Sequence, residues 1–242
     1  MADKIVIAFD LYGTLLSTES IGRELARHFG EEKAGEVAAL WRRFQLEYTW
    51  RVNSMGIYKP FSDITQTSLQ HALAESHVEL SEDGILDLMK AYDDLGTFDD
   101  VAPGLELIRN TPTIDAYVFS NGTNKMVFQS VNHSPSLSSS ASVFKDLITV
   151  EDVQAYKPHP KVYQHLAKKV GKENAMESVW LVSGNPFDVV GARAVGMQAA
   201  WVDRAGGGWN DRLGTLAKGG PTIVVDGVEG AVQGIREWSE KN

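Results

Sequence analysis

The sequence predicts an α/β fold, with a parallel β-sheet core and a helical segment inserted after the first strand. Two observations lead to this prediction. Short apolar runs recur along the chain and alternate with helical patterns, which is typical of parallel strands that are buried on both faces. One long stretch after the first run carries helical patterns and no convincing strand. We therefore expect a sheet-based core and one helical insertion.

The first predicted strand is Ile5–Phe9, in which every residue is apolar. Later apolar runs each predict a further strand, and helical patterns separate several of them, so the strands are expected to be parallel. These later runs cover residues 116–119, 179–182, 199–202 and 222–225, with a shorter one near 147–150.

Three segments between these strands have the features of helices. Pro103 is placed for a helix start, where its missing N–H is tolerated. Val162, Leu166 and Val170 recur at every fourth position, which favours one buried helix face. A further helix is expected over residues 186–195, ending before Gly196. The serine-rich segment 134–142 is expected to be a flexible loop.

The inserted stretch covers residues 17–97 and is expected to form a helical cap. Such an insertion can bury its own small core and close over the carboxyl ends of the strands, where open α/β sheets bind ligands. The core is then expected to comprise residues 1–16 and 98–242. Apolar stripes with helical spacing support the insertion: Ile21, Leu25 and Phe29; Val37, Trp41, Phe44 and Tyr48; Ile85, Leu88, Met89 and Tyr92.

Composition excludes several classes of protein. The 242 residues carry a net charge of −9, which argues against nucleic acid and anionic membranes as partners. The absence of cysteine excludes disulfides, thiolate metal ligands and cysteine nucleophiles. No apolar stretch is long enough to span a membrane, and no secretory signal is evident. We therefore expect a cytoplasmic protein.

Polar residues follow the predicted strands at four places. Asp10-Leu-Tyr-Gly-Thr14 follows the first strand, and Ser120-Asn121 ends the second. Lys157 precedes a helix, and Ser183-Gly-Asn-Pro-Phe-Asp188 ends a later strand. Taken singly, each has a structural explanation: Asp10 as a turn former, Lys157 as a solvated surface residue, and Asn185 and Asp188 as parts of a helix start.

In this order, from Asp10 to Trp201, the four motifs and the position of the insertion resemble the haloacid dehalogenase superfamily. The resemblance implies a Rossmann-like core with an inserted α-helical cap, and Asp10 as a carboxylate nucleophile. Phosphatases of the superfamily carry a second Asp two residues after the nucleophile, where this chain has Tyr12. They also hold magnesium with acidic residues at the fourth motif, where this chain has Ser183, Gly184 and Asn185.

The segment 41–48 closely resembles a cap helix of the L-2-haloacid dehalogenases, in which the first arginine, here Arg42, binds the departing halide. The resemblance then implies hydrolysis of short L-2-haloacids to D-2-hydroxy acids, with inversion, through an ester on Asp10 and without metal or cofactor. Small halogenated carboxylic acids are the expected partners. Dimers are common in the family, so the resemblance is also compatible with a homodimer, which the sequence alone does not predict. Gly184 departs from the family, which commonly has a second serine after Ser183.

The resemblance also implies a role for each candidate residue. Lys157 supplies the counter-charge that keeps Asp10 ionised, and Asp188 positions or deprotonates the attacking water. The expected catalytic set is Asp10, Thr14, Ser120, Lys157, Ser183, Asn185 and Asp188. The expected substrate and halide set is Arg42, Asn121 and Phe187 around the halide, Tyr12, Leu46 and Phe61 around the alkyl group, Tyr163 orienting Lys157, and Leu11.

Two other functions compete with this interpretation. A phosphatase or phosphonatase of the same superfamily would require magnesium, whereas the dehalogenase should tolerate EDTA. A non-enzymatic binding module would have no need for a nucleophile beside Lys157 and Asp188. The release of halide in the presence of EDTA discriminates among the three.

Overall fold

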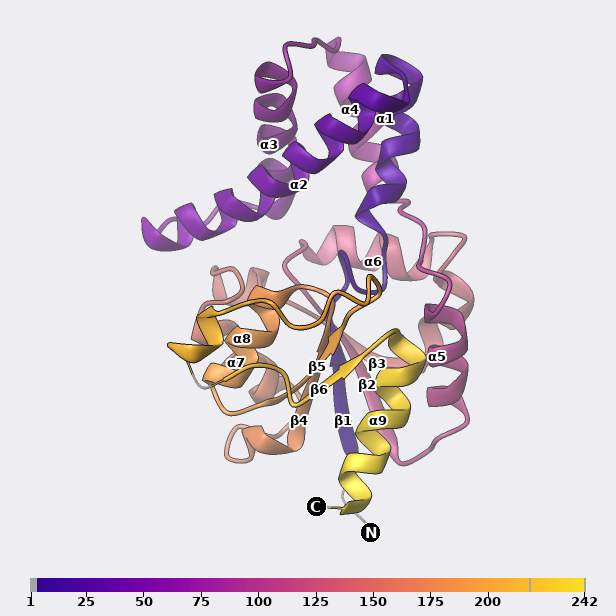
Figure 1. Ribbon diagram of the computed structural model, residues 1–242, viewed down its shortest axis with the longest axis vertical. Coiled ribbons are helices and arrows are strands. Elements are labelled where there is room, and N and C mark those ends of the chain that lie inside the picture. Colours follow the sequence, from indigo (N-terminus) through magenta and orange to yellow (C-terminus); the bar gives the residue numbers. More distant parts are fainter. Residues whose placement is uncertain (1–3, 218, 242) are drawn as a thin grey trace.

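The computed structural model describes residues 4–217 and 219–241 (Figure 1). Within them the strands form one six-stranded sheet, and every pair of neighbours is parallel. The strand order is β3-β2-β1-β4-β5-β6, with β1 in the interior of the sheet. The predicted α/β fold is therefore confirmed. The strands are β1 Ile5–Phe9, β2 Ile114–Ser120, β3 Phe144–Thr149, β4 Val179–Ser183, β5 Gln198–Val202 and β6 Ile223–Val225.

Helices cover both faces of this sheet. Figure 1 shows α5 and α9 on one side and α7 and α8 on the other, so the sheet is doubly wound. Their bounds are α5 Val101–Arg109, α6 Asn124–Asn132, α7 Pro160–Lys169, α8 Pro186–Ala194 and α9 Val228–Lys241. Short 3₁₀ turns are η1 Thr18–Ser20, η2 Ser138–Val143, η3 Glu151–Val153, η4 Met176–Ser178 and η5 Leu213–Thr215.

The edge strand β3 differs from its prediction. The apolar run near 147–150 covers only its last residues, because the strand already begins at Phe144. Lys145 and Asp146 interrupt the pattern, and both are exposed. An edge strand is covered less completely than an interior one, so it tolerates polar residues. Such residues interrupt the apolar run by which a strand is predicted.

The inserted stretch forms a separate helical group above the sheet, coloured indigo to pink in Figure 1. Helix α2 is the longest element of the group and packs against both α1 and α3. Trp41 on α2 and Leu25 on α1 are buried, as their stripes predict. The helices of this group are α1 Ile21–Phe29, α2 Glu31–Ser54, α3 Phe61–Glu75 and α4 Glu82–Tyr92.

Two chain crossings join the helical group to the sheet, and they run side by side. Leu16 and Thr97 form an antiparallel bridge. The Ser17 backbone N–H donates to the carbonyl of Gly96 at 2.8 Å, and Phe98 N–H donates to Leu15 at 3.4 Å. The chain therefore leaves and re-enters the core at one place, a few residues beyond Asp10.

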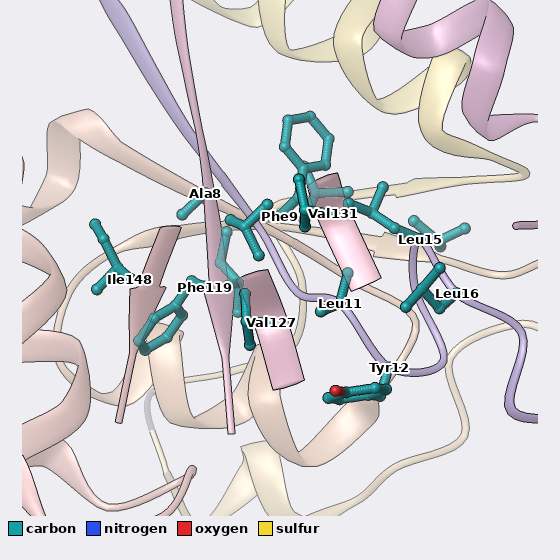
Figure 2. Packing of buried hydrophobic residues seen from close by; sticks show 14 of the residues in the cluster. Ala8, Phe9, Leu11, Tyr12, Leu15, Leu16, Phe119, Val127, Val131 and Ile148 are labelled. Atoms are coloured by element: carbon teal, nitrogen blue, oxygen red, sulfur yellow. The ribbon is translucent and has the colours of Figure 1, made fainter. Parts of the chain in front are cut away.

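A hydrophobic cluster extends from the sheet into the helical group. Figure 2 shows Phe9, Leu11 and Leu15 among the buried side chains at the end of β1. The ring of Tyr12 extends the cluster into the helical group, because it packs on Phe61 of α3 at 5.6 Å and on Tyr92 of α4 at 5.5 Å between centroids. Aromatic pairs at this spacing stabilise the contact between the two parts.

The serine-rich segment is more ordered than predicted. Most of it forms η2, which packs against α5 and α6. Leu137 is fully buried, and its N–H donates to the buried hydroxyl of Ser134 at 3.3 Å. A single buried leucine therefore anchors a segment whose serine content suggested a flexible loop. Along residues 4–217 and 219–241, no helix combines the length and apolarity that a membrane crossing requires.

Candidate active site

Asp10 lies at the carboxyl edge of the sheet because β1 ends at Phe9. Its N–H still donates to Val182 of β4 at 3.0 Å, so the parallel register places it beside the end of β4. Gly13 then turns the chain with φ +83°, a conformation that favours glycine. The turn leaves the Asp10 side chain facing the ends of the neighbouring strands.

Three side chains donate to one oxygen of Asp10. Thr14 Oγ1 and Asn185 Nδ2 each lie 2.7 Å from Oδ2, and Ser183 Oγ lies 3.3 Å away. Asp10 is only 6% exposed, so these donors replace water around the charged carboxylate. These donors therefore compensate the carboxylate for the water that it loses on burial.

Lys157 occupies the space between two carboxylates. Its ammonium lies 3.0 Å from Asp10 Oδ1 and 2.7 Å from Asp188 Oδ2, and it also donates to the carbonyl of Phe119 at 2.8 Å. Lys157 is 1% exposed, so the solvated surface alternative is wrong. Burial alone lowers the pKa of Lys157, but the two carboxylates raise it above its usual value, and the ammonium stays charged.

Asp188 is the second carboxylate of the cluster and is fully buried at the first turn of α8. Its Oδ1 accepts a hydrogen bond from Tyr163 OH at 2.8 Å. Burial raises the pKa of Asp188 to about 6, against the opposing attraction of Lys157. A carboxyl group with this pKa changes charge near neutrality, as a general base should. Tyr163 contacts Asp188 rather than Lys157, so any orientation of Lys157 by Tyr163 acts through Asp188.

Asn185 does not cap α8 with its side chain, although it stands at the N-cap position. Its amide nitrogen donates to Asp10 and, at 3.0 Å, to the carbonyl of Tyr12. Its amide oxygen accepts from Arg42 at 3.1 Å. The helix-start explanation is wrong for this side chain, which instead links Asp10 to the helical group.

Arg42 reaches the site from α2 of the helical group. Its guanidinium donates to three neutral acceptors: Asn185, the Tyr12 carbonyl at 3.2 Å and Gln45 Oε1 at 2.8 Å. Among the described residues it has no carboxylate within ion-pair distance. A partly buried cation without a counter-ion favours binding of an anion. Arg43, its neighbour, is exposed and pairs with Glu75 at 3.3 Å.

Two cavities reach the predicted halide residues. Arg42 lines one of about 440 Å³ between α1 and α2, together with Gly22, Gly35, Ala38, Ala39 and Thr18. Phe187 lines the other, also about 440 Å³, where α2 meets the core. Its ring packs edge-on against Trp50 at 5.4 Å between centroids. Arg42 and Phe187 therefore border open space.

The remaining predicted residues lie around the cluster with less direct contacts. Ser120 is buried and accepts from the Gly122 N–H at 3.0 Å. Asn121 Oδ1 accepts from the Lys157 backbone N–H at 3.0 Å, so it positions the lysine loop. Leu11 is fully buried in the hydrophobic cluster, and Leu46 is half-buried on α2.

Gln45 belongs to the site although the sequence reasoning missed it. It is buried, and its amide donates to Thr65 Oγ1 and to Tyr92 OH, each at 2.9 Å, while its oxygen accepts from Arg42. Gln45 therefore fixes the direction of the guanidinium. The available signal was a polar residue four positions after Trp41, on the buried stripe of a helix.

Gly184 has a steric role. A Cβ at this position would lie 2.6 Å from the backbone oxygen of Gly13. The Gly184 N–H also donates to Thr14 Oγ1 at 2.9 Å. The glycine therefore lets the loop after β4 approach the turn after β1 more closely than a side chain would allow.

Comparison with known proteins places this geometry in a family. The model of the haloacid dehalogenase-like hydrolases matches residues 6–196. Haloacetate dehalogenase H-2 of Moraxella sp. (strain B) is 33% identical over 83% of this chain and 86% of the relative. The (S)-2-haloacid dehalogenase 4A of Burkholderia cepacia is 33% identical over 82% of each chain.

A solved structure agrees with these relatives. It is L-2-haloacid dehalogenase from Xanthobacter autotrophicus with chloropropionic acid covalently bound, which is 25% identical and superposes with a TM-score of 0.81. The match covers 96% of this chain and 98% of that chain. The chain therefore belongs to the haloacid dehalogenase-like hydrolases, within the group of the L-2-haloacid dehalogenases.

Proposed function

We propose that the protein hydrolyses short L-2-haloacids to D-2-hydroxy acids through an ester on Asp10, without a metal ion. The observation that carries the proposal is the buried cluster in which Lys157 lies between Asp10 and Asp188, at 3.0 and 2.7 Å. One carboxylate serves as nucleophile and the other as base. The relatives act, by name, on haloacetate and (S)-2-haloacids, which supports this substrate class.

In the first step, Asp10 attacks the carbon that bears the halogen, and the carbon–halogen bond breaks as the carbon inverts. Oδ1 is the better nucleophile, because within the described part of the chain it accepts only from Lys157, whereas Oδ2 has three side-chain donors. The halide leaves with the bonding electrons toward Arg42, which offers it an uncompensated positive charge. The covalently bound chloropropionic acid in the Xanthobacter enzyme supports an ester of this kind.

In the second step, water attacks the ester carbonyl carbon of Asp10 and loses a proton to Asp188. Oδ2, now the carbonyl oxygen, gains negative charge where Thr14, Asn185 and Ser183 already donate to it, so the same donors stabilise the intermediate. The departing alkoxide takes a proton from Lys157, which regains one from Asp188. The balance is one water consumed, with one halide and one proton released.

We propose that residues 17–97 act as a cap over the core, residues 1–16 and 98–242. Of this core, residues 1–3, 218 and 242 lie outside the described part of the chain. Arg42 reaches Asn185, and Gln45 holds Arg42, because α2 lies over the ends of the strands. Phe61 and Tyr12 stack between the two parts and exclude water from the nucleophile side.

The site does not favour phosphate chemistry. Tyr12, at the position of the phosphatase acid, is buried, and burial raises its pKa far above the usual range. Lys157 already offsets part of the charge of Asp10 and Asp188, which weakens their attraction for magnesium. A halide leaves without a proton, so the missing acid does not hinder dehalogenation.

The experiment that tests the function is release of chloride from L-2-chloropropionate in EDTA, with the D-enantiomer as control. We expect release from the L-form alone, and no stimulation by magnesium. Release that requires magnesium, or hydrolysis of a phosphate ester in its place, would contradict the proposal. Monochloroacetate and monofluoroacetate, which lack a chiral centre, then measure how far the substrate range extends toward haloacetates.

A further inference from the structure

Arg204 links the loop after β5 to two other segments near the site, the turn after β1 and the segment before α5. It follows β5, where Asp203 N–H donates to Val225 of β6 at 2.7 Å and fixes the backbone. Its guanidinium then donates to both oxygens of Asp100, at 2.7 and 2.8 Å, and to the carbonyl of Thr14 at 2.8 Å. Such a two-pronged arrangement holds the guanidinium in one orientation.

The contacts of Arg204 lie on the core side of both crossings between the core and the helical group. Thr14 precedes the outgoing crossing, whereas Phe98 and Asp100 follow the returning one. The guanidinium carbon also lies 3.8 Å from the centroid of the Phe98 ring, a cation–π contact. Asp100 in turn accepts from the Val228 N–H at the start of α9, at 2.7 Å.

Asp100 is held as a carboxylate by these partners. Burial by itself raises the pKa of Asp100, but the hydrogen bonds from Arg204 and from the Val228 backbone lower it below its usual value. The carboxylate form that the ion pair with Arg204 requires is therefore favoured. Its two side chains are 21% and 26% exposed, so water screens the pair only in part.

Thr14 is the residue through which this arrangement reaches the chemistry. Its hydroxyl donates to Asp10 Oδ2 at 2.7 Å and accepts from Gly184 N–H at 2.9 Å, while its carbonyl accepts from Arg204. One residue thus connects the nucleophile on its side-chain face with Arg204 on its backbone face. A shift of the Thr14 backbone moves the hydroxyl that contacts Asp10.

We propose that Arg204, held by Asp100, is a positioning residue that fixes Thr14 against the nucleophile at the junction of the two crossings. The proposal rests on the proposed function, because its effect is read in the Asp10 reaction. Arg204 itself does not touch the substrate.

The test compares Arg204→Met and Arg204→Lys with the parent enzyme on L-2-chloropropionate. We expect Arg204→Met to lower kcat by about tenfold to 100-fold with KM changed less than about threefold, since small displacements of catalytic groups have effects of this size. Arg204→Lys should recover only part of the loss, because an ammonium cannot bind Asp100 and Thr14 as a fork. Asp100→Asn should lower kcat in the same direction.

The matched control is Arg193→Met. Arg193 is also partly buried and binds the Met197 carbonyl and Gln198, at 2.7 and 2.8 Å, but it does not contact Thr14 or the crossings. Its loss should change kcat less than about threefold. Thermal melting of every variant identifies any that is unfolded at the assay temperature.

A double-mutant cycle separates positioning from general stabilisation. In a Thr14→Ala background the hydroxyl is gone, so Arg204→Met should reduce the rate of ester formation far less than it does in the parent enzyme. Equal effects in both backgrounds, or a kcat loss matched by Arg193→Met, would overturn the proposal. If the parent enzyme itself releases no halide, the proposed function fails instead, and the two failures remain distinguishable.

Discussion

At the scale of single residues, the site depends on one buried charge pattern. Two carboxylates and one ammonium leave a net negative charge in a nearly closed space. Removing Lys157 would leave Asp10 and Asp188 to repel each other. The free energy of folding lost in this way would far exceed the net stabilisation that the two ion pairs provide. The different roles that we propose for Asp10 and Asp188 match their different donors: Asp10 has three neutral donors on one oxygen, and Asp188 has Tyr163.

The pKa of Asp188 predicts how the second step depends on pH. Burial raises it to about 6, and the base is active only when it is ionised. The rate of ester hydrolysis should therefore be full above that pH and fall as pH decreases through about 6. Tyr163→Phe removes a hydrogen bond that favours the carboxylate, so the fall should begin at higher pH. Tyr117→Phe, on β2, is the control and should leave the profile unchanged.

This prediction is checked with rapid-quench measurements of the ester and the free product across pH. A profile that stays flat down to pH 5 in the parent enzyme would contradict the assignment of Asp188 as base, as would a Tyr163→Phe profile that moves to lower pH.

Adjacent arginines of α2 offer a second prediction. Arg42→Gln removes the uncompensated cation at the halide position and should lower kcat by about 100-fold or more, as is usual for a group that stabilises developing charge. Arg43→Gln removes an exposed ion pair and should change kcat less than about twofold. The measurement is steady-state halide release by both variants. Equal losses of kcat in the two variants would contradict the assignment of Arg42 to halide binding.

At the scale of elements, helix α2 determines how the helical group contacts the core. Asn53, near its end, exchanges two hydrogen bonds with the backbone of Tyr156, at 2.7 and 2.8 Å. Tyr156 immediately precedes Lys157, so α2 and the lysine loop are fixed to each other. Trp50, one turn earlier, packs on Phe187 at the start of α8.

Asn53→Ala should therefore loosen this contact. Two partly buried hydrogen bonds contribute about 1–2 kcal/mol together, which in a chain of this size corresponds to a fall in Tm of a few degrees. We also expect KM to rise, because the lysine loop and α2 lose their fixed relation. Asn132→Ala is the control, since its amide binds only a carbonyl of its own helix. Unchanged Tm and KM in Asn53→Ala would show that the two bonds do not hold the parts together.

The elements themselves were largely predictable because interior strands must be apolar on both faces. Ile5–Phe9 and the runs at 116–119, 179–182 and 199–202 all fall within strands of the sheet. The predicted position of edge strand β3 was shifted, because polar residues interrupt its apolar run. The segment that forms η2 was predicted to be a flexible loop, because one buried residue such as Leu137 leaves no periodic signal. Local patterns detect faces of elements, whereas single anchors depend on tertiary packing.

The site was predictable only in part, for a related reason. The order of the motifs predicted Asp10, Lys157 and Asp188 together, and the structure brings these side chains into contact. The sequence around Asn185 is equally compatible with a helix cap, and only the approach of the turn after β1 directs its amide elsewhere. Arg204 carries no motif, because Thr14 and Asp100 lie far away in the sequence. Gln45 was visible only as a polar residue on the buried stripe of its helix.

At the scale of the whole molecule, the proposed function requires an anionic protein to bind an anionic substrate. The net charge of −9 opposes this at long range, so Arg42 and Lys157 must act at short range inside a water-poor site, where electrostatic interactions are stronger. The helical group supplies Arg42 and the core supplies Lys157. The reaction that we propose therefore requires both parts of the molecule in contact, with Asp10 at the boundary between them.

The most direct test of the central claim is a single turnover of L-2-chloropropionate by excess enzyme in heavy-oxygen water. If Asp10 forms the ester, the new hydroxyl oxygen comes from its carboxylate. The product should then be unlabelled, and mass spectrometry should find the heavy oxygen in the peptide that contains Asp10. Fully labelled product with an unlabelled peptide would mean that water attacks the substrate directly, and the account of Asp10 as nucleophile would be wrong.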